Sequence, residues 1–222
     1  MKFLPFSVNS GKKNMEIDEE ILNNSINTQS KDAVFRLYAW NPPCISLGRN
    51  QSDNFLDTKI LTKYNIDVVR RLTGGRALLH DKEITYSFVC PENYLKNGGS
   101  VIESYKEISQ ILIDTFQTLG IELSLGGEKG IHTKFDYCML ISTGADLCYN
   151  GRKFIGSAQY RKNRYILQHG SILLDYNREL LEELFKEKVT TDSIISLKEI
   201  NPEISAQKIV EAFNIKLASQ ST

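Results

Sequence analysis

The sequence lacks an excess of either charge, a long apolar run and a recognisable targeting segment. Lys plus Arg and Asp plus Glu number 27 each, so the chain has no general electrostatic attraction for nucleic acids or anionic membranes. No apolar stretch approaches the roughly 20 residues of a membrane span, and the N-terminus, interrupted at Pro5, is unlike a signal peptide. We therefore expect a cytoplasmic protein that binds neither nucleic acid nor membrane.

The spacing of the four cysteines excludes further classes of site. None of Cys44, Cys90, Cys138 and Cys148 forms a Cys-x-x-Cys pair, which excludes zinc-ribbon and thioredoxin-type sites, and no metal site is expected. We expect reduced thiols, with Cys44, Cys90 and Cys148 packed among apolar residues. Cys138 follows a polar stretch, and its thiol would become nucleophilic if Lys153 lay near enough to lower the thiol pKa.

Hydrophobic periodicity and turn residues predict one α+β domain over residues 1–222, with a mainly antiparallel sheet flanked by helices. Helices are predicted over residues 14–27, 54–64, 101–119, 177–186 and 205–214. Strands are predicted over residues 33–40, 44–47, 67–72, 77–79, 83–90 and 121–125, and again between 146 and 175 with turns at Asn150-Gly151 and Lys162-Asn163. The strand over 67–72 is expected to be buried.

A double glycine with flanking arginines is the first candidate for a binding site. Gly74-Gly75 follows a predicted strand, permits close approach of a ligand to the backbone and exposes N–H groups. Arg71 and Arg76 add charged donors on either side. The segment is no P-loop, because Gly-Lys-Ser/Thr does not follow. An ordinary tight turn with solvated arginines explains the same residues, and both interpretations stay open.

Two later strands carry the other unusual residues. Alternation places Lys153, Ile155 and Ser157 on one face of a strand, where the lysine could point into a pocket and polarise a carbonyl. A solvent-facing lysine beside a hairpin turn is the alternative. His169 stands between apolar runs in the next strand, where a binding role and a hydrogen-bonded core position are equally compatible with the pattern.

Taken together, these segments resemble the lipoate–biotin protein ligase superfamily, and most closely its LipM-type octanoyltransferase branch. The order and spacing of several motifs carry this resemblance. They are Arg36-Leu37-Tyr38-Ala39-Trp40-Asn41-Pro42-Pro43, Ser46-Leu47-Gly48-Arg49-Asn50-Gln51, Arg71-Leu72-Thr73-Gly74-Gly75-Arg76-Ala77, Gly151-Arg152-Lys153 with Gly156-Ser157-Ala158-Gln159, and Leu167-Gln168-His169-Gly170-Ser171-Ile172. One departure is that Ser142-Thr143-Gly144 stands where the branch usually has a proline-serine pair.

The resemblance implies a lipoate/biotin protein ligase-like catalytic domain that acylates a lysine. Octanoyl-acyl carrier protein would be the donor, and a lipoyl domain such as the glycine cleavage H protein the acceptor. Cys138 would carry the acyl group as a thioester, Lys153 would lower the thiol pKa, and no cofactor would be needed. The alternatives are an ATP-dependent lipoate–protein ligase requiring ATP and Mg, a lipoyl amidotransferase, and an acyl-binding module without turnover.

The resemblance also implies a set of substrate-binding residues around the acyl group. Glycines and small residues would leave room for the chain, and leucine and isoleucine would form apolar wall. The expected substrate-binding residues are Arg71, Thr73, Gly74, Gly75, Arg76, Leu78, His80, Tyr86, Ile155, Gly156, Ser157, Ala158, Gln159, His169 and Gly170.

Overall fold

The computed structural model describes residues 1–127, 144, 146–189 and 192–218 of the chain. Their elements follow one another as β1 (Lys2–Asn9), α1 (Gly11–Asn27), β2 (Val34–Trp40), β3 (Cys44–Leu47), α2 (Thr58–Lys63), β4 (Asp67–Arg70), β5 (Leu78–His80), β6 (Glu83–Pro91), a 3₁₀ turn (Glu92–Tyr94), α3 (Val101–Thr118), β7 (Ser124–Leu125), β8 (Leu147–Tyr149), β9 (Arg152–Lys162), β10 (Tyr165–Leu173), α4 (Arg178–Phe185), α5 (Leu197–Ile200) and α6 (Ala206–Ala218).

Two sheets organise these elements. The larger has seven strands in the order β1-β2-β6-β10-β9-β8-β7, and the smaller has three in the order β4-β3-β5. Antiparallel pairs dominate, with parallel pairing between β1 and β2 and between β3 and β4. The α+β prediction with a mainly antiparallel sheet flanked by helices is therefore confirmed.

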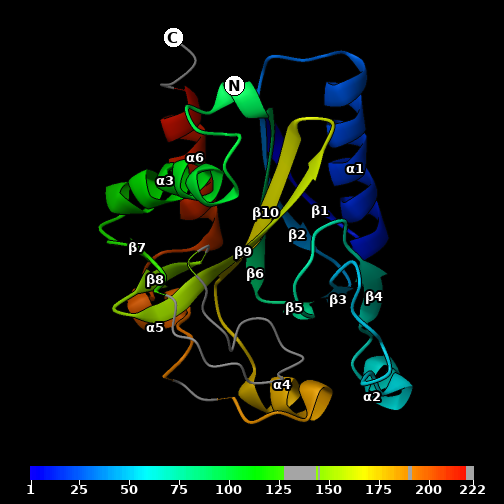
Figure 1. The fold of residues 1–222 in the computed structure, drawn as a ribbon. Helices are drawn as coiled ribbons and strands as arrows, with labels where there is room; N and C mark the ends of the chain where they lie inside the picture. Colours follow the sequence, from blue (N-terminus) through cyan, green and yellow to red (C-terminus); the bar gives the residue numbers. More distant parts are fainter. Residues whose placement is uncertain (128–143, 145, 190–191, 219–222) are drawn as a thin grey trace.

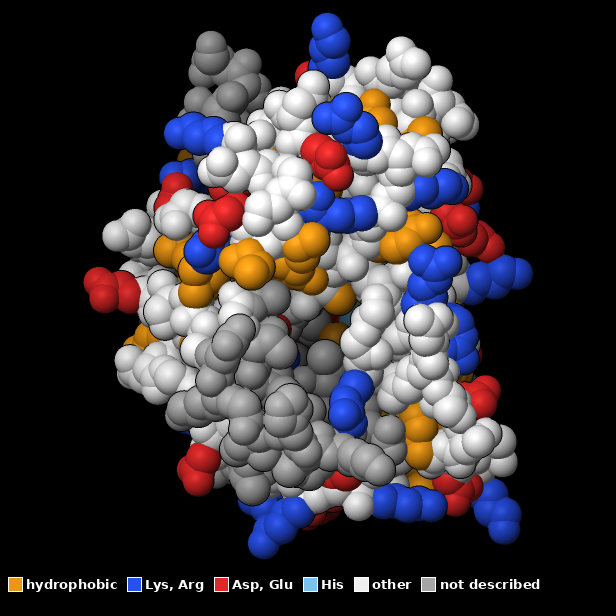
Figure 2. Space-filling view, in the orientation of Figure 1, with side chains coloured by type: hydrophobic (Ala, Val, Ile, Leu, Met, Phe, Trp, Pro, Cys, Tyr) orange, Lys and Arg blue, Asp and Glu red, His pale blue; other side chains and the backbone are white. Residues whose placement is uncertain are grey.

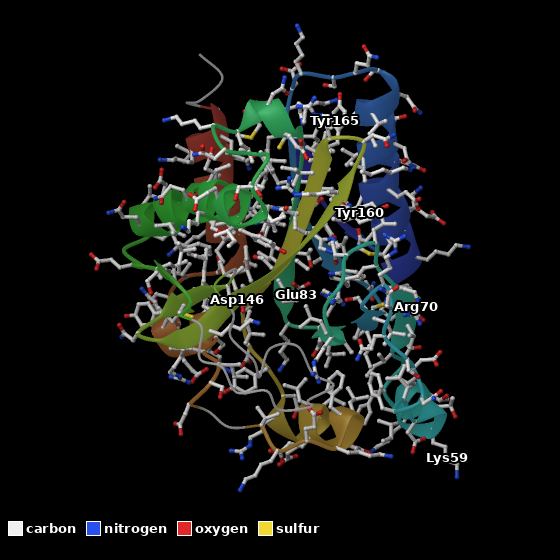
Figure 3. All side chains as sticks on the ribbon, in the orientation of Figure 1. Lys59, Arg70, Glu83, Asp146, Tyr160 and Tyr165 are labelled. Carbon is white, nitrogen blue, oxygen red and sulfur yellow. The ribbon has the colours of Figure 1, made fainter. Side chains whose placement is uncertain are left out.

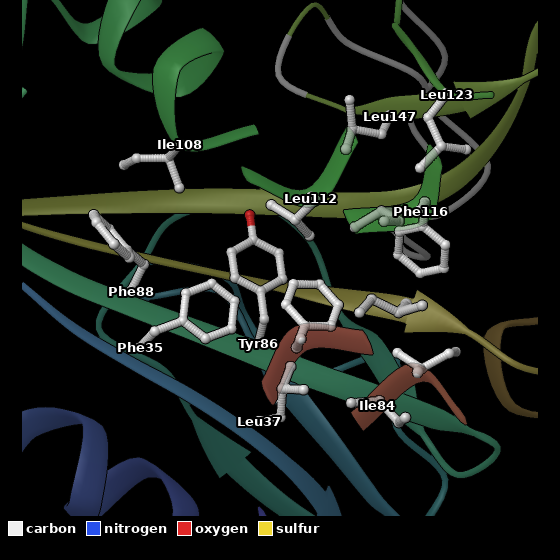
Figure 4. Packing of buried hydrophobic residues seen from close by; sticks show 14 of the residues in the cluster. Phe35, Leu37, Ile84, Tyr86, Phe88, Ile108, Leu112, Phe116, Leu123 and Leu147 are labelled. Atoms are coloured by element: carbon white, nitrogen blue, oxygen red, sulfur yellow. The ribbon is translucent and has the colours of Figure 1, made fainter. Parts of the chain in front are cut away.

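Helices cover both faces of the large sheet, with α1 on one side and α3 and α6 on the other (Figure 1). Alternation along β6 explains this layering, since neighbouring side chains of a strand point to opposite faces. Tyr86 and Phe88 join the core under α3 and α6 (Figure 4). Phe213 of α6 stacks on Phe35 in the same core. Val89 packs instead against Leu22 of α1. Helices and sheet therefore form a three-layer arrangement.

Local signals placed the long helices correctly. Ser100 caps α3 by accepting a hydrogen bond from the Glu103 backbone, and Gly120 follows the helix in the left-handed region at φ +74°, as its freedom from a Cβ allows. The turn at Asn150-Gly151 is confirmed, with positive φ at both residues. The second hairpin turns one residue later than predicted, at Asn163-Arg164.

Other local predictions were wrong. Residues 67–72 form a strand only to Arg70, and most of β4 is exposed because it is an edge strand of the small sheet. The predicted helix over 54–64 is only Thr58–Lys63, and the predicted strand over 121–125 is only Ser124–Leu125. The strand β1 and the short helix α5 had no counterpart among the predicted elements. Pro5 lies within β1, which is the edge strand of the large sheet, a position that tolerates proline.

The surface shown in Figure 2 carries basic and acidic side chains interspersed, without a large patch of either sign. This distribution agrees with the equal numbers of positive and negative residues. No helix within the described ranges is both long and apolar enough to span a bilayer.

Candidate functional site

A cavity lies where the large sheet meets the small one, and its exposed wall is mainly apolar. Its lining residues come from α1, β2, β3, β5, β6, β9, β10 and the double-glycine segment. They are Met15, Tyr38, Trp40, Ser46, Arg71, Leu78, His80, Thr85, Gly156, Ser157, Ala158, His169, Gly170 and Ser171.

Arg71 holds the double-glycine turn in place. Its guanidinium donates to the backbone carbonyls of Ser46, Gly74 and Arg76, each at 2.8 Å, and the side chain is buried. Gly75 has a φ of +93°, and a Cβ on Gly48 would collide with the Gly75 carbonyl. The glycines therefore permit a close contact between two loops, and Arg71 is a buried structural donor as well as a cavity residue. The alternative of a turn with solvated arginines is wrong for Arg71.

His169 belongs to a buried polar network on the α1 side of the sheet. Its Nε2 lies 2.7 Å from the Thr73 hydroxyl and its Nδ1 lies 3.3 Å from Asp18. Asp18 also accepts hydrogen bonds from Arg36 at 2.8 Å and from the Tyr38 hydroxyl at 2.9 Å. Burial alone would raise the pKa of Asp18, but its hydrogen bonds and its cationic neighbours outweigh burial and lower that pKa.

His80 occupies a second buried network. Its Nε2 lies 2.8 Å from the Ser46 hydroxyl, its Nδ1 lies 3.2 Å from Glu83, and its ring stacks on Trp40 with centroids 3.9 Å apart. Burial lowers the pKa of His80, and the nearby Glu83 carboxylate opposes that effect. The lowered pKa favours the uncharged form of the ring, which faces the cavity.

Lys153 is buried, so the alternative of a solvent-facing lysine is wrong. The side chain is 1% exposed, and its Nζ lies 3.0 Å from Oδ2 of Asp146, itself 2% exposed. The other carboxylate oxygen, Oδ1, accepts a hydrogen bond from the Ser157 backbone N–H at 3.2 Å. Figure 3 places Asp146 beside β8 and β9. The ion pair is thus fixed to the strand whose Ser157 lines the cavity.

The structure brings together many of the predicted substrate-binding residues. Those that line the cavity are Arg71, Leu78, His80, Gly156, Ser157, Ala158, His169 and Gly170. Thr73 and Tyr86 are buried behind the wall, bonded to His169 and Ser157.

Besides Thr73 and Tyr86, five predicted residues do not line the cavity. Gly74, Gly75 and Arg76 form the turn at its edge, and Gly74 and Gly75 are exposed. Ile155 is fully buried in the main core, so it is not the expected cavity wall. Gln159 also lies off the cavity, bonded to Gln168 and Ser104. Substrate contact remains a prediction for the whole set.

Cys138 lies outside the described residues, so its distance from Lys153 is untested. The other three cysteines are buried free thiols, as predicted. Burial raises the pKa of both Cys44 and Cys90 to about 12, which makes them poor nucleophiles near neutral pH. Among the described residues, no cluster of His, Cys, Asp or Glu is arranged to hold a metal ion.

Sequence reasoning missed several residues of the site. Asp146, the partner of Lys153, gave no signal beyond its position at the start of a strand-like stretch. Asp18 stands in a predicted helix, and Arg36 and Tyr38 stand in one of the motifs that carry the resemblance, but their mutual contacts depend on packing of α1 against the sheet. The cavity residues that were not predicted are Met15, Tyr38, Trp40, Ser46, Thr85 and Ser171.

Comparison with known proteins gives a family match and several similar sequences. The family described as the lipoyl protein ligase A/B catalytic domain matches residues 10–218. An octanoyltransferase LipM of Geobacillus kaustophilus is 39% identical over 181 residues, covering 78% of this chain and 65% of the relative. An octanoyltransferase LipM of Carboxydothermus hydrogenoformans is 38% identical over 188 residues, covering 84% and 70%. The matched part of the chain therefore spans about two thirds of the length of these relatives.

A solved structure shows the same fold. Protein Ta0514 of T. acidophilum, determined with bound lipoic acid, superposes with a TM-score of 0.76 at 16% identity. The match covers 98% of this chain and 84% of that protein. At this identity the similarity establishes the architecture only.

Proposed function

We propose, from the premise that the chain belongs to the lipoyl protein ligase A/B catalytic domain family, that it is an octanoyltransferase of protein lipoylation. It moves an octanoyl group from acyl carrier protein to a lysine of a lipoyl domain, such as the glycine cleavage H protein. The observation that carries this proposal is the identity of 38–39% with octanoyltransferases over most of the chain. No cofactor takes part, because the thioester donor is already activated.

The proposed reaction has two halves. In the first, the Cys138 thiolate attacks the donor carbonyl, a new carbon–sulfur bond forms, and the carrier leaves as a thiolate that takes up a proton. In the second, the acceptor amine attacks the acyl-Cys138 carbonyl, a carbon–nitrogen bond forms, and Cys138 leaves again as a thiolate. The amine gives up the proton that balances the first half.

The buried Lys153 supports this chemistry. An ammonium group removed from water interacts strongly with a neighbouring anion, because the local dielectric is low. The Asp146 carboxylate holds it in one position at 3.0 Å, and a positively charged group near a thiol stabilises the thiolate. In the proposal, Lys153 stabilises the Cys138 thiolate and then orients the acyl carbonyl.

The cavity supports an aliphatic substrate. Met15, Trp40 and Leu78 provide apolar surface, while Gly156 and Gly170 provide wall without side chains. Burying each methylene of an acyl chain contributes about 0.8 kcal/mol. A medium-length chain therefore gains substantial binding energy here without a charged contact along its length.

The test is the intact mass of the protein after mixing with octanoyl-acyl carrier protein in the absence of ATP. We expect one octanoyl group on Cys138, mapped by peptide analysis and discharged on adding a lipoyl domain. Cys138→Ser should abolish the adduct, whereas the matched control Cys90→Ala, which removes a buried core thiol, should retain it. Retained transfer by Cys138→Ser would refute the nucleophile. Lipoyl-domain modification only with ATP, Mg and free acid would show a ligase instead.

A further inference from the structure

A chain of hydrogen bonds with a single direction runs between the large sheet and α3, and it begins at Arg161. The guanidinium can only donate. Its Nε donates to Oε1 of Gln159 at 2.9 Å, and its other nitrogens bond the Ser104 hydroxyl at 2.6 Å and the Glu92 carboxylate at 3.1 Å. Because Arg161 occupies the amide oxygen of Gln159, the orientation of that amide is fixed, and its NH₂ group must donate elsewhere.

The donor-to-acceptor direction fixed at Gln159 continues through the following hydrogen bonds. Gln159 Nε2 donates to Oε1 of Gln168 at 3.0 Å, so Gln168 Nε2 donates in turn to the Tyr86 hydroxyl oxygen at 2.9 Å. The Tyr86 oxygen lies 2.7 Å from Oγ of Ser157. Tyr86 is fully buried, with its ring packed in the core beside Phe35 (Figure 4). A buried hydroxyl that donates no hydrogen bond is energetically costly. The Tyr86 O–H therefore donates to Ser157, which is its acceptor among the described residues.

Ser157 is the end of this chain. Because its oxygen accepts from Tyr86, its own proton is left to donate, and no acceptor for that proton is found among the described side chains. Ser157 lines the cavity, and its backbone N–H binds the same Asp146 that pairs with Lys153. Gly170 of β10 lies between Tyr86 of β6 and Ser157 of β9 and leaves room for their hydroxyl groups to meet. An added Cβ at Gly170 would lie 2.6 Å from Tyr86 Cε1 and 2.9 Å from Ser157 Oγ.

We propose that the Ser157 hydroxyl donates a hydrogen bond to the carbonyl oxygen of the acyl group held beside Lys153, and that Tyr86 is the positioning residue that orients this donor. The inference deepens the proposed function and rests on it for the identity of the acyl group. Hydrogen bonds in such a series polarise one another. The order from Arg161 to Ser157 therefore strengthens the final donor.

The donor acts when a nucleophile adds to the acyl carbon. The carbonyl π electrons move onto oxygen, and the Ser157 O–H stabilises the resulting oxyanion without giving up its proton. When the carbonyl re-forms and the leaving group departs, the hydrogen bond weakens again. Because the same oxyanion forms in both halves of the transfer, Ser157 serves both.

The experiment compares Ser157→Ala and Tyr86→Phe with a matched control, Tyr165→Phe. Tyr165 also lies on the β9–β10 hairpin, at the end away from Asp146 (Figure 3), and its hydroxyl donates to the Ser30 carbonyl at 3.1 Å. Each variant binds [1-¹³C]octanamide, which cannot react, and isotope-edited infrared spectroscopy records the carbonyl stretch. Single-turnover acylation by octanoyl-acyl carrier protein is measured in parallel.

We expect the carbonyl stretch to shift to higher frequency in Ser157→Ala and Tyr86→Phe and to stay unchanged in Tyr165→Phe. Acylation should slow about 10²–10³-fold in Ser157→Ala, as when an oxyanion donor is lost, with little change in KM. Tyr86→Phe should slow it less, and should add nothing in the Ser157→Ala background.

An unchanged carbonyl frequency in Ser157→Ala would overturn the donor, and a further loss from Tyr86→Phe in that background would overturn the coupling. The octanamide measurement separates this inference from the proposed function. If Ser157→Ala shifts the carbonyl frequency but the wild-type protein forms no acyl-Cys138, the donor is supported and the transferase chemistry is refuted.

Discussion

Removing the charge of Lys153 should destabilise the protein far more than removing an exposed lysine. Lys153 and Asp146 are 1% and 2% exposed and lie 3.0 Å apart, so Lys153→Met leaves a carboxylate buried beside an apolar side chain. Losing one partner of a buried ion pair costs about 3–5 kcal/mol. In a chain of this size each kcal/mol lowers the melting temperature by about 2–4 °C, so the variant should melt about 10 °C lower.

The assay is urea unfolding followed by far-ultraviolet circular dichroism, for Lys153→Met, Asp146→Asn and the double variant. Because the double variant has neither buried charge, its loss should be smaller than the sum of the two single losses by about 0.5–3 kcal/mol. The control is Lys106→Met. Lys106 forms an equally short pair with Glu103, at 2.8 Å, but both side chains are more than 40% exposed, and exposed pairs contribute at most about 1 kcal/mol.

A loss below about 1 kcal/mol for Lys153→Met would refute the reasoning, because it would place the pair in the energetic class of exposed pairs. If the loss of unfolding free energy in the double variant equalled the sum of the two single losses, the direct coupling of the two charges would be refuted. The double variant also separates stability from chemistry. It should regain part of the stability and none of the acyl transfer, since the cation proposed to stabilise the thiolate is still missing.

Three further results are expected. Gly170→Ala should lower the unfolding free energy by about 1–3 kcal/mol, because its Cβ would meet atoms at 2.5–2.9 Å, whereas Gly99→Ala, with nothing within 4 Å, should change it by less than about 0.5 kcal/mol. Burial alone would raise the pKa of Asp18, but its hydrogen bonds and charged partners outweigh burial and lower that pKa below its usual value. Asp18 therefore stabilises the fold at pH values above its unfolded-state pKa, and this contribution is lost as pH falls through the folded-state pKa. Asp18→Asn should remove this pH dependence from the unfolding free energy measured by urea titration. Iodoacetamide at roughly pH 8 should modify Cys44 and Cys90 only in urea, as intact mass would show, because burial raises their pKa to about 12.

Long periodic segments and turn residues were predictable because their signals are local. The apolar repeat of α3, its Ser100 cap and the Asn150-Gly151 turn each depend on a few neighbouring residues. The exposure of β4 was not predictable in this way. Val68 and Val69 are apolar in sequence, yet Val68 is 38% exposed, because the strand order that leaves β4 at an edge is set by distant elements.

In the candidate site, too, the local signals were predictable and the long-range contacts were not. The motifs that marked Lys153 and His169 located two strands of the cavity, since each motif is contiguous. The partners Asp146 and Asp18 were not found, because Asp146 meets Lys153 across a hairpin and Asp18 reaches His169 from α1. Which of a strand's two faces is buried also depends on these long-range contacts. A single sequence therefore indicated where the site lies and left its electrostatics undetermined.

The internal pairing of the cavity's polar groups bears on its choice of ligand. Arg71, His80 and His169 all line the wall, but each is already bonded to protein partners. An aliphatic chain that covers them therefore leaves no hydrogen bond broken, and a polar chain gains little from groups that are already satisfied. Among the described atoms of the wall, Ser171 Oγ is the buried one that lacks a partner. In the proposed function, selectivity for an apolar chain thus follows from how the protein satisfies its own polar groups, as much as from the apolar lining itself.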